Sequence, residues 1–475
     1  MRPPAAASAR VRLGRSHLLI PAVFLLCQAL VVARGLNGPF LDEAVNVTAG
    51  LQILRGQPGQ FGWLGGSVYL YPVLAGAAYP FGGLGATRLM TAVLYASTLW
   101  LFSRFATSLF GRRASAFATG LLAINGLFFS LAHFAVYDAL SLLGVCGAAW
   151  AAVEMSRTGR VGWMVVSGLF GALAIASKYP SVIALLSVVG VAMVLARGRR
   201  AFALAALSIA VAALALTCYM LVVHGFLIPR VALTQAIGEP EIFDRATLAY
   251  QVCYALGLPF ALALLGARRV RREDRLLALA LLGGSLPWPV LHVVLGRYVS
   301  LVKDSAFGFL TLYPLAGVAL AELWRERRLK GLALVGLAGV WGAAQSYWQD
   351  RSWEDIRPVV QFILPQLRPD QRVALEHGWS FSMYAVLEHH LPSTSSVIDR
   401  YRYEHGEDVC DADWIVGTLR ADGDTSDPLV RAAQSCRFTL AKAFPYDFYT
   451  PLPPLVRHLS WEYVVFRRAP SSSSR

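Results

Sequence analysis

The feature that most constrains this chain is a series of long apolar runs that contain almost no charge. Several of them extend for about 18 residues or more, the length of a membrane-spanning helix. Of the 475 residues, 56% are hydrophobic and only 15% are charged, whereas an ordinary soluble domain carries about 25% charged residues. This composition excludes disorder, collagen, a coiled coil and a small disulfide-rich protein. It argues against a soluble enzyme and predicts a polytopic α-helical membrane protein.

The apolar runs predict about eleven spans. The first, at residues 17–33, follows four arginines. A signal peptide is the competing interpretation, but the run ends in Arg34-Gly-Leu-Asn and not in a small-residue cleavage site. We therefore expect a first spanning helix here. The further spans are expected at 86–110, 114–132, 138–155, 161–177, 180–196, 201–223, 246–266, 276–295, 305–323 and 331–348.

The basic residues indicate the orientation of these spans. A net charge of +14 would suggest nucleic acid in a soluble protein. Here the basic residues form short clusters between apolar runs, so the membrane explains them and no nucleic-acid partner is expected. The positive-inside rule places such clusters in the cytoplasm. They lie at 112–113, 157–160, 197–200, 268–275 and 325–330.

The predicted topology divides the chain into three parts. These are a cytoplasmic N-terminus at 1–16, a transmembrane domain at 17–348 with an outer loop at 34–85, and an extracytoplasmic domain at 349–475. Residues 67–85 are apolar enough for another span. They contain two prolines, however, and an additional span would reverse every later loop against the rule. We expect a re-entrant or interfacial segment.

The tail predicts a small α/β domain of about 120 residues. Charges become frequent there, and residues 355–367 suit a helix. Cys410 and Cys436 lie in this region and can pair if it faces an oxidising space. The other four cysteines lie in apolar runs and resemble core residues. Five short runs suit strands, at 372–376, 396–399, 414–417, 438–441 and 461–466.

Two adjacent acids, Asp42 and Glu43, follow the first span and begin a second helical segment. Acids in a first turn commonly stabilise a helix through its cap and its dipole, by about 0.5–2 kcal/mol. Alternatively, a carboxylate at the membrane surface can serve as a general base or bind a cation. Both interpretations stay open on the residues alone.

Asp138 begins the fourth span on the same side, and His133 lies shortly before it. Asp138 can cap its helix, which is the simpler role. A carboxylate at membrane depth is also a functional candidate. A single histidine is more often a hydrogen-bonded interior residue than a ligand.

Basic residues also occur on the outer side, against the topological trend. Lys178 is one of only four lysines, and it ends the fifth span beside Tyr179. Its alternatives are a snorkelling lysine at the interface and a cation that holds a lipid phosphate. Arg297 and Lys303 add positive charge before the tenth span.

The known nucleotide and hydrolase motifs are absent from the sequence. It contains no Walker loop, no Cys/His metal pattern, no Ser/His/Asp signature and no dinucleotide-binding glycine fingerprint. Chemistry on the outer face cannot easily use a cytoplasmic nucleotide-sugar. An activated donor would have to arrive already carried across the membrane on a lipid.

These features together resemble the GT-C class of integral-membrane glycosyltransferases. The resemblance is strongest to the bacterial branch that includes protein O-mannosyltransferases, lipid A aminoarabinose transferase and rhizobial galacturonosyltransferases. It covers residues 36–324, more weakly the tail. The order of the motifs carries it: the pair Asp42-Glu43, the segment Leu51–Gly56, the turn Phe110–Arg113, Asp138, and Ser177-Lys178-Tyr179-Pro180.

The resemblance implies a polyprenyl-phosphate sugar donor and an envelope lipid, glycan or protein acceptor. It makes Asp42 the catalytic carboxylate, with Glu43 in support. Lys178 would hold the donor phosphate. The other implied site residues are Arg297 and Lys303 at the phosphate, and His133, Asp138 and Tyr179 around the site. The chain lacks an arginine that members often have near Lys303, and members differ in whether they need a divalent metal ion, so both points stay open.

The resemblance also implies a location in a bacterial inner membrane, with the C-terminal domain in the periplasm. Two other functions stay open. A lipid or sugar transporter would show paired half repeats with broken helices and charges at mid-membrane, and the candidate charges instead cluster at one face. A catalytically degenerate GT-C subunit is the third possibility, against which Asp42, Asp138 and Lys178 argue.

Overall fold

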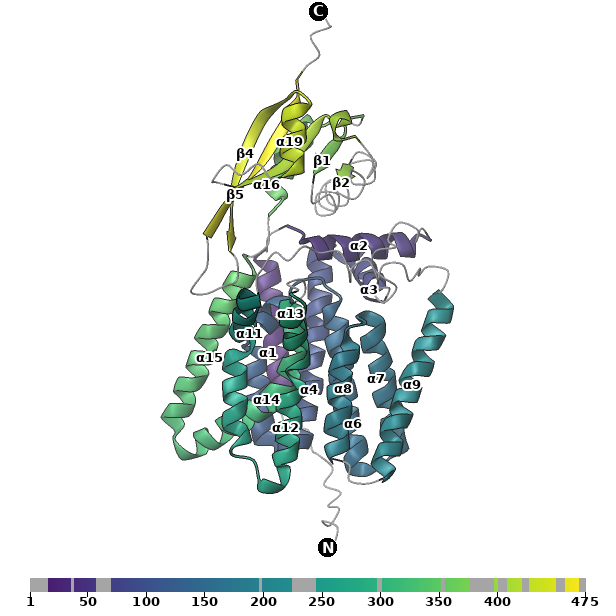
Figure 1. Ribbon diagram of the computed structural model, residues 1–475, viewed down its shortest axis with the longest axis vertical. Coiled ribbons are helices and arrows are strands. Elements are labelled where there is room, and N and C mark those ends of the chain that lie inside the picture. Colours follow the sequence, from purple (N-terminus) through teal and green to yellow (C-terminus); the bar gives the residue numbers. More distant parts are fainter. Residues whose placement is uncertain are drawn as a thin grey trace, which may run out of the picture.

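The protein consists of a helical bundle and a smaller α/β domain (Figure 1). The α/β domain lies beyond one end of the bundle, and the first helix begins at the opposite end. The structure is a computed structural model. It describes residues 16–35, 38–56, 70–195, 199–223, 245–296, 301–351, 355–368, 370–375, 397–399, 408–420, 427–449 and 458–469.

The described bundle follows the apolar runs of the sequence. Its helices are α1 (Ser16–Ala33), α4 (Gly83–Ala123), α5 (Gly126–Leu131), α6 (Asp138–Thr158), α7 (Val161–Ser177), α8 (Ser181–Leu195), α9 (Arg199–Val223), α11 (Arg245–Ala267), α12 (Arg275–Gly284), α13 (Pro287–Leu295), α14 (Leu301–Glu326) and α15 (Arg328–Gln349).

Six helical segments among the described residues are long and apolar enough to cross a membrane. Three shorter apolar helices accompany them, at His17–Ala33, Val161–Ser177 and Ser181–Leu195. The predicted helical membrane class is confirmed, whereas the predicted number of eleven spans is not and stays a prediction. The six segments are Gly83–Ala123, Asp138–Thr158, Phe202–Tyr219, Arg245–Ala267, Arg272–Leu295 and Leu301–Glu326.

Helix α4 contains a break where the sequence predicts a turn between two spans. Gly111 has a φ of 82°, a conformation that glycine adopts without steric cost. The hydroxyl of Ser115 donates to the carbonyl of Ser103 over 2.7 Å, although a straight helix would separate these residues by about 18 Å. The chain therefore folds back here. The second leg ends at Ala123, before the predicted end at residue 132, and Asn125 caps the short helix α5.

The span predicted at 276–295 consists of two helices, α12 and α13. The chain leaves the helix at Ser285 and Leu286, and Pro287 begins α13. Proline suits the first position of a helix because its missing N–H would be unpaired there anyway. Inside a continuous helix it would remove a hydrogen bond.

Two short helices lie across the end of the bundle that faces the α/β domain, namely α2 (Leu41–Leu54) and α3 (Leu70–Ala78) (Figure 1). They cross at Gly50 and Gly76. A Cβ on Gly50 would lie 1.8 Å from the carbonyl oxygen of Pro72, and one on Gly76 would lie 2.4 Å from the backbone of Gly50. Only glycine permits this contact. The described part of the predicted interfacial segment, from residue 70 onward, thus includes α3 at the bundle end.

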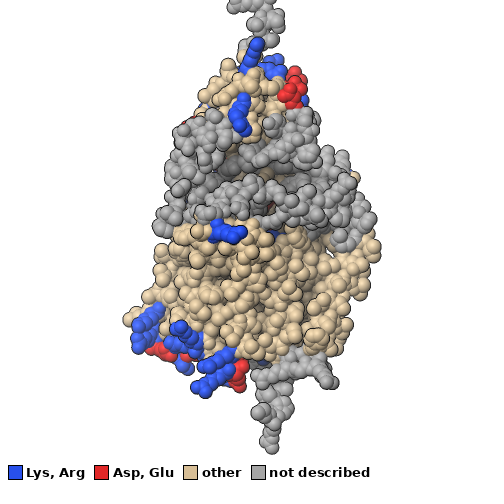
Figure 2. All heavy atoms as spheres, viewed as in Figure 1, with Lys and Arg blue, Asp and Glu red and all other residues tan. Residues whose placement is uncertain are grey.

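The flank of the bundle presents apolar side chains. Leu186 is 63% exposed, Leu214 66% and Val340 71%, a surface that is unfavourable in water and suits hydrocarbon. Figure 2 shows that lysines and arginines gather at the end of the bundle away from the α/β domain. This distribution agrees with the positive-inside prediction.

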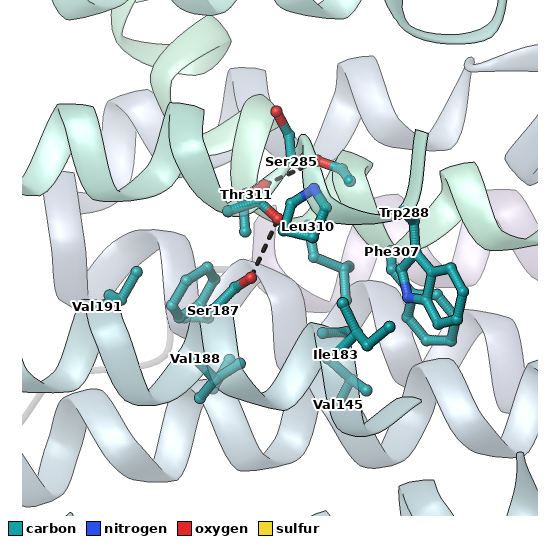
Figure 3. A pocket seen from close by; sticks show the side chains of 16 residues that line it. Val145, Ile183, Ser187, Val188, Val191, Ser285, Trp288, Phe307, Leu310 and Thr311 are labelled. Carbon is teal, nitrogen blue, oxygen red and sulfur yellow. Dashed lines mark hydrogen bonds between the residues drawn. The ribbon is translucent and has the colours of Figure 1, made fainter. Parts of the chain in front are cut away.

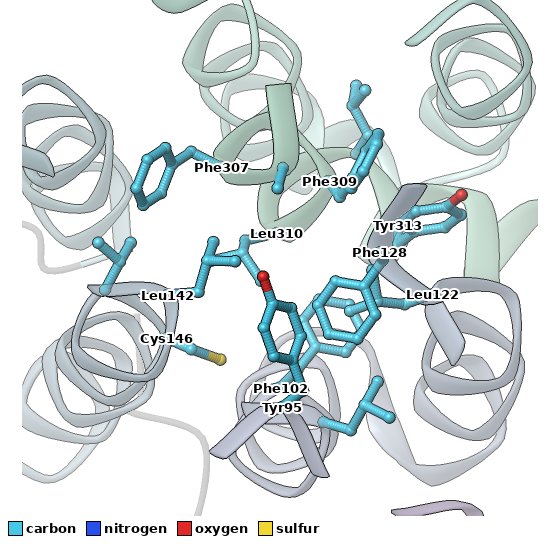
Figure 4. Packing of buried hydrophobic residues seen from close by; sticks show 14 of the residues in the cluster. Tyr95, Phe102, Leu122, Phe128, Leu142, Cys146, Phe307, Phe309, Leu310 and Tyr313 are labelled. Atoms are coloured by element: carbon cyan, nitrogen blue, oxygen red, sulfur yellow. The ribbon is translucent and has the colours of Figure 1, made fainter. Parts of the chain in front are cut away.

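The interior of the bundle is closely packed with aromatic and aliphatic side chains (Figure 4). Tyr95 and Phe102 of α4 lie in its centre, facing Leu142 of α6 and Phe309 of α14. The rings of Tyr95 and Phe128 meet edge to face at 4.9 Å between centroids. This core fixes the helix ends that carry the polar residues described below.

The C-terminal domain contains a five-stranded sheet in the order β2-β1-β3-β5-β4. β1 pairs in parallel with β2 and β3, whereas β5 pairs antiparallel with β3 and β4. All five predicted strands are present, and the last three are longer than predicted. Their bounds are β1 (Val373–Leu375), β2 (Val397–Asp399), β3 (Trp414–Arg420), β4 (Phe438–Tyr449) and β5 (His458–Arg468).

Each face of this sheet buries its own apolar cluster. Helix α16 (Arg357–Ile363) packs against Trp414 on one face, and α19 (Pro428–Ser435) packs against Ile415 on the other. Cys410 and Cys436 form a disulfide. The alternation of buried residues along β3 therefore produces a two-sided α/β domain.

Asp355 connects this domain to the loop that leads into α2. Its carboxylate accepts hydrogen bonds from the backbone N–H of Gly38, at 3.1 Å, and from Arg357, at 2.7–3.1 Å. Burial alone would raise the pKa of Asp355. The bonds from Arg357 and Gly38 outweigh burial, and the pKa lies below its usual value. The contact lies four residues before Asp42.

Candidate active site

The two acids at the start of α2 have different surroundings. The side chain of Glu43 is 0% exposed, whereas that of Asp42 is 28% exposed. Successive residues of a helix point about 100° apart, so one side chain faces the bundle and the other faces its open end. The sequence places these residues together but does not distinguish them.

Glu43 is fully engaged by hydrogen-bond donors. Arg88 of α4 donates from Nε at 2.8 Å and from a terminal nitrogen at 2.6 Å. The backbone N–H groups of Phe40 and Ala135 donate to the same carboxylate at 3.0 and 2.8 Å. Such a bidentate pair with additional amide donors is strong and specific in geometry. Glu43 therefore joins α2 to α4 and to the segment before α6.

Asp42 pairs with Lys303 of α14. The side chain of Lys303 is 11% exposed, and its ammonium lies 5.3 Å from the centroid of the Phe40 ring. The pair joins residues 261 positions apart. Asp42 is the more accessible of the two partners, and a general base must be reachable by the proton that it takes.

Lys178 lies in a second and more buried cluster. Its ammonium donates to Asp138 at 2.7 Å and to Asp304 at 2.6 Å. All three side chains are at most 4% exposed. The rings of Tyr137 and Phe307 lie 5.7 and 5.9 Å from the ammonium. A single lysine thus compensates two buried carboxylates.

The two carboxylates of this cluster differ in their second oxygen. His292 of α13 lies 2.9 Å from the second oxygen of Asp304. The second oxygen of Asp138 is buried and has no hydrogen-bond partner among the described residues. A buried acceptor without a partner is costly, which marks Asp138 as the point where an additional donor would fit.

His133 is buried, but it contacts neither the Asp42–Lys303 pair nor the Lys178 cluster. One ring nitrogen lies 3.0 Å from Gln28 of α1 and the other lies 3.0 Å from Asp350, which follows α15. The ring centroid of His133 lies 5.1 Å from that of Phe134, which in turn contacts Phe40. The structure therefore places His133 between α1 and the end of α15, and the rings of Phe134 and Phe40 connect it to the loop before Asp42.

A narrow cavity lies between α6, α8, α13 and α14, where Phe307, Trp288 and Ile183 form much of its wall (Figure 3). The hydroxyls of Ser187, Ser285 and Thr311 lie in its wall, and all three donate to backbone carbonyls. Phe307 also lies beside Lys178. Phe307 therefore separates the buried cluster from this apolar cavity.

The structure brings Asp42 to Lys303, and Asp138 to Lys178, among the predicted site residues. Tyr179 is 49% exposed and makes no described contact with either cluster. Arg297 lies outside the described residues. Cys410 and Cys436 lie in the C-terminal domain, away from the site.

Sequence reasoning missed the roles of three residues. Arg88, Asp304 and His292 each contact a predicted residue through a charged or hydrogen-bonded side chain. Arg88 and Asp304 are charges inside otherwise apolar runs. Ionisable residues in such runs are functional or paired as a rule, and this signal identifies both.

Among the described residues, no group of three His, Cys, Asp or Glu side chains is arranged to hold a metal ion. Each described carboxylate of the two clusters instead contacts an ammonium or guanidinium group. We therefore derive no step through a metal ion.

Comparisons with known proteins agree with this picture. Residues 82–224 match the family model for dolichyl-phosphate-mannose-protein mannosyltransferase. No curated protein sequence matches the chain significantly. The crystal structure of ArnT from Cupriavidus metallidurans is similar in the apo state, with a TM-score of 0.58 and 15% identity over 94% of this chain and 97% of that one.

Three further structures are similar over most of this chain. ArnT from Cupriavidus metallidurans bound to undecaprenyl phosphate has a TM-score of 0.57 and 16% identity, over 95% of this chain and 98% of that one. The oligosaccharyltransferase AglB from Archaeoglobus fulgidus, in complex with an inhibitory peptide and a dolichol-phosphate, has a TM-score of 0.50 and 12% identity, over 83% of this chain and 69% of that one. The arabinofuranosyltransferase AftD from Mycobacteria has a TM-score of 0.54 and 16% identity, over 96% of this chain and 42% of that one.

The family model matches part of the chain and these structures are all of glycosyltransferases, which agrees with the predicted resemblance. At identities of 12–16%, the structural similarity establishes the fold of this chain and nothing more. The chain therefore has the GT-C fold of polytopic membrane glycosyltransferases.

Proposed function

We propose that this protein transfers a monosaccharide from a polyprenyl-phosphate donor to a hydroxyl of an envelope acceptor, at the periplasmic face of a bacterial inner membrane. The observation that carries the proposal is the partly exposed Asp42 beside Lys303, at the end of the bundle that faces the C-terminal domain. A base and a cation adjacent to one open surface suit a transfer that moves a proton and releases a phosphate.

In the proposed step, Asp42 takes the proton of the acceptor hydroxyl as its oxygen attacks the anomeric carbon. The bond between that carbon and the phosphate oxygen breaks, and the leaving polyprenyl phosphate takes the bonding electrons. A single displacement of this kind inverts the anomeric configuration. Glu43 does not serve as the base in this proposal, because four donors occupy its oxygens.

Lys303 serves the donor phosphate. Its ammonium pairs with Asp42, and the phosphate oxygens of a donor would compete with that carboxylate for the same cation. Donor binding would therefore draw Lys303 away from Asp42. A carboxylate without its counterion is more basic, so the donor would prepare the base for the acceptor. Lys178 adds positive charge deeper in the site, beside the oxygen of Asp138 that lacks a partner.

The apolar side chains around Phe307 offer a surface against which the first isoprenyl units of the donor could pack. Phe307 lies one helical turn after Lys303 on α14, so both side chains lie on one face of that helix. The narrow cavity beside Phe307 is lined mostly by apolar side chains from α8, α13 and α14. Undecaprenyl phosphate is bound by ArnT and a dolichol-phosphate by AglB, which supports a lipid phosphate as the donor here.

The test is sugar transfer by the purified chain in lipid bilayers, with a panel of polyprenyl-phosphate sugars and envelope acceptors. Asp42→Asn should lower turnover by about 10²–10⁴-fold, the usual contribution of a general base, with donor binding kept. Glu43→Gln is the comparison variant, and its loss should appear first in thermal stability. Full turnover in Asp42→Asn would overturn the assignment of the base. No turnover with any donor would overturn the proposed function.

A further inference from the structure

A second, larger cavity lies on another flank of the bundle, between α1, α15 and the junction of α4 and α5. Its volume is about 740 Å³, within the range of about 300–1,000 Å³ that ligand sites occupy. None of the residues proposed for the transfer lines it. The cavity extends along the membrane-spanning part of α1, where Leu19 and Val23 are more than half exposed.

The wall of this cavity is mostly apolar, and glycines without side chains leave space along it. Gly120 and Gly339 both line it, and a Cβ on either would meet no atom within 4 Å. Gly126 and Gly342 line it as well, but they are required for contact between helices, since a Cβ on either would lie 2.0 Å or less from a backbone oxygen. Open space beside the first pair therefore belongs to the cavity.

The cavity ends at a fixed cation. Arg351 follows α15, and its guanidinium carbon lies 3.8 Å from the centroid of the Tyr347 ring, one turn earlier. Contact with a ring holds a guanidinium in place and leaves its N–H groups available to an anion. No described carboxylate forms an ion pair with Arg351.

The neighbouring acid does not cancel this charge. Gln28 donates from its amide nitrogen to the carbonyl of Phe129, so its oxygen accepts from one ring nitrogen of His133. The other ring nitrogen faces the carboxylate of Asp350. Asp350 also lines the cavity, but its carboxylate faces the His133 ring and the hydroxyl of Ser346, and no described ion pair joins it to Arg351.

We propose that this cavity is a binding site for a membrane phospholipid, with its acyl chains along α1 and α15 and its phosphate on Arg351. A phosphodiester carries one negative charge, which suits the guanidinium of Arg351, since no described carboxylate pairs with it. An apolar cavity open to the flank of a spanning bundle is filled by hydrocarbon chains in a membrane. The site differs from the proposed donor site in its helices and in its cation. It does not depend on the proposed transfer.

The native cysteines supply a direct test. Cys27 lines the cavity and is exposed, whereas Cys218 on α9 and Cys253 on α11 are exposed elsewhere. The detergent-solubilised full chain is alkylated with N-ethylmaleimide, and each thiol is quantified by mass spectrometry, with and without phosphatidylglycerol. Phosphatidylglycerol should slow alkylation of Cys27 and leave the other two unchanged. Diacylglycerol, which lacks the phosphate, should need about tenfold more lipid for the same protection.

Two comparisons locate the lipid: one between two leucine variants of α15, and one between the two lipids in a variant of Arg351. Gly339→Leu should abolish the lipid-dependent protection by filling the cavity. Gly336→Leu is the matched control on the same helix, because a Cβ there also meets nothing within 4 Å but Gly336 does not line the cavity. Arg351→Gln should remove the difference between phosphatidylglycerol and diacylglycerol.

Four results would overturn the proposal. Equal protection by both lipids in the wild type would show that the phosphate is not recognised. Equal behaviour of the two leucine variants would place the lipid elsewhere. Stronger protection by a polyprenyl phosphate would assign the cavity to the donor, and protection that accompanies dimer formation without lipid would assign it to a second copy of the chain. All are binding results, so they stand whether or not sugar transfer is found.

Discussion

The Asp42–Lys303 pair and the Lys178 cluster use the same residue types on the same side of the bundle, yet they differ in access. Asp42 is 28% exposed and has one described charged partner. Lys178, Asp138 and Asp304 are at most 4% exposed and compensate one another. The open pair can exchange its partner for a substrate, whereas the closed cluster can do so only at the cost of leaving a charge buried.

The difference teaches that burial, more than residue type, separates a reactive group from a supporting one. Lys178 is the rarer and more conspicuous lysine in the sequence, and the resemblance makes it the phosphate ligand. Its two short bonds to carboxylates indicate instead that its first role is to hold α6, α14 and the end of α7 together. Lys303 is the more exposed of the two lysines, which is why we propose it as the cation for the donor phosphate.

The largest expected effect is on stability, at the closed cluster. Lys178→Met leaves two buried carboxylates without their cation, and breaking such a buried pair costs about 3–5 kcal/mol. Thermal unfolding of the purified protein in detergent measures this. Lys178→Met combined with Asp304→Asn should recover part of the loss, because one buried negative charge is removed. Equal unfolding temperatures for Lys178→Met and Lys303→Met would abolish the distinction between the two clusters.

A smaller effect, on binding, is expected at the open pair. Lys303→Gln removes the cation proposed for the donor phosphate and keeps a polar side chain beside Asp42, so the fold should be retained. Loss of one charge-assisted bond corresponds to about tenfold weaker donor binding. Titration with a polyprenyl phosphate checks this, with Lys330→Gln at the opposite end of the bundle as the matched control. Unchanged affinity would return the phosphate to Lys178.

The bundle was predictable from the sequence to the extent that local signals determine it. Apolar length predicts helices, and the glycine between two apolar runs predicts the turn at Gly111, because only glycine readily takes that conformation. The break at Ser285 was missed, because the apolar run continues through it and Pro287 can either kink a helix or begin one.

The site was predictable only in part, because its contacts join distant positions. The acidic pair is adjacent in the chain and was found at once. The partners that give the two acids different roles are Arg88, 45 positions from Glu43, and Lys303, 261 positions from Asp42. Helix packing determines these distances. No pattern in a single sequence states which acid faces which cation.

The smallest expected effect concerns metal removal, and it tests both regions together. Lys178 occupies the position between Asp138 and Asp304 that a divalent cation would otherwise take, and Lys303 does the same beside Asp42. A metal ion would have to displace an ammonium that already neutralises these oxygens. Transfer should therefore be unchanged after treatment with a chelator and after addition of Mg²⁺ or Mn²⁺. Loss of turnover that is restored by one metal would mean that a divalent cation takes the place beside Asp42 that Lys303 leaves when the donor binds. Asp42 would then be the first residue to examine, because the open pair can separate without leaving a buried charge.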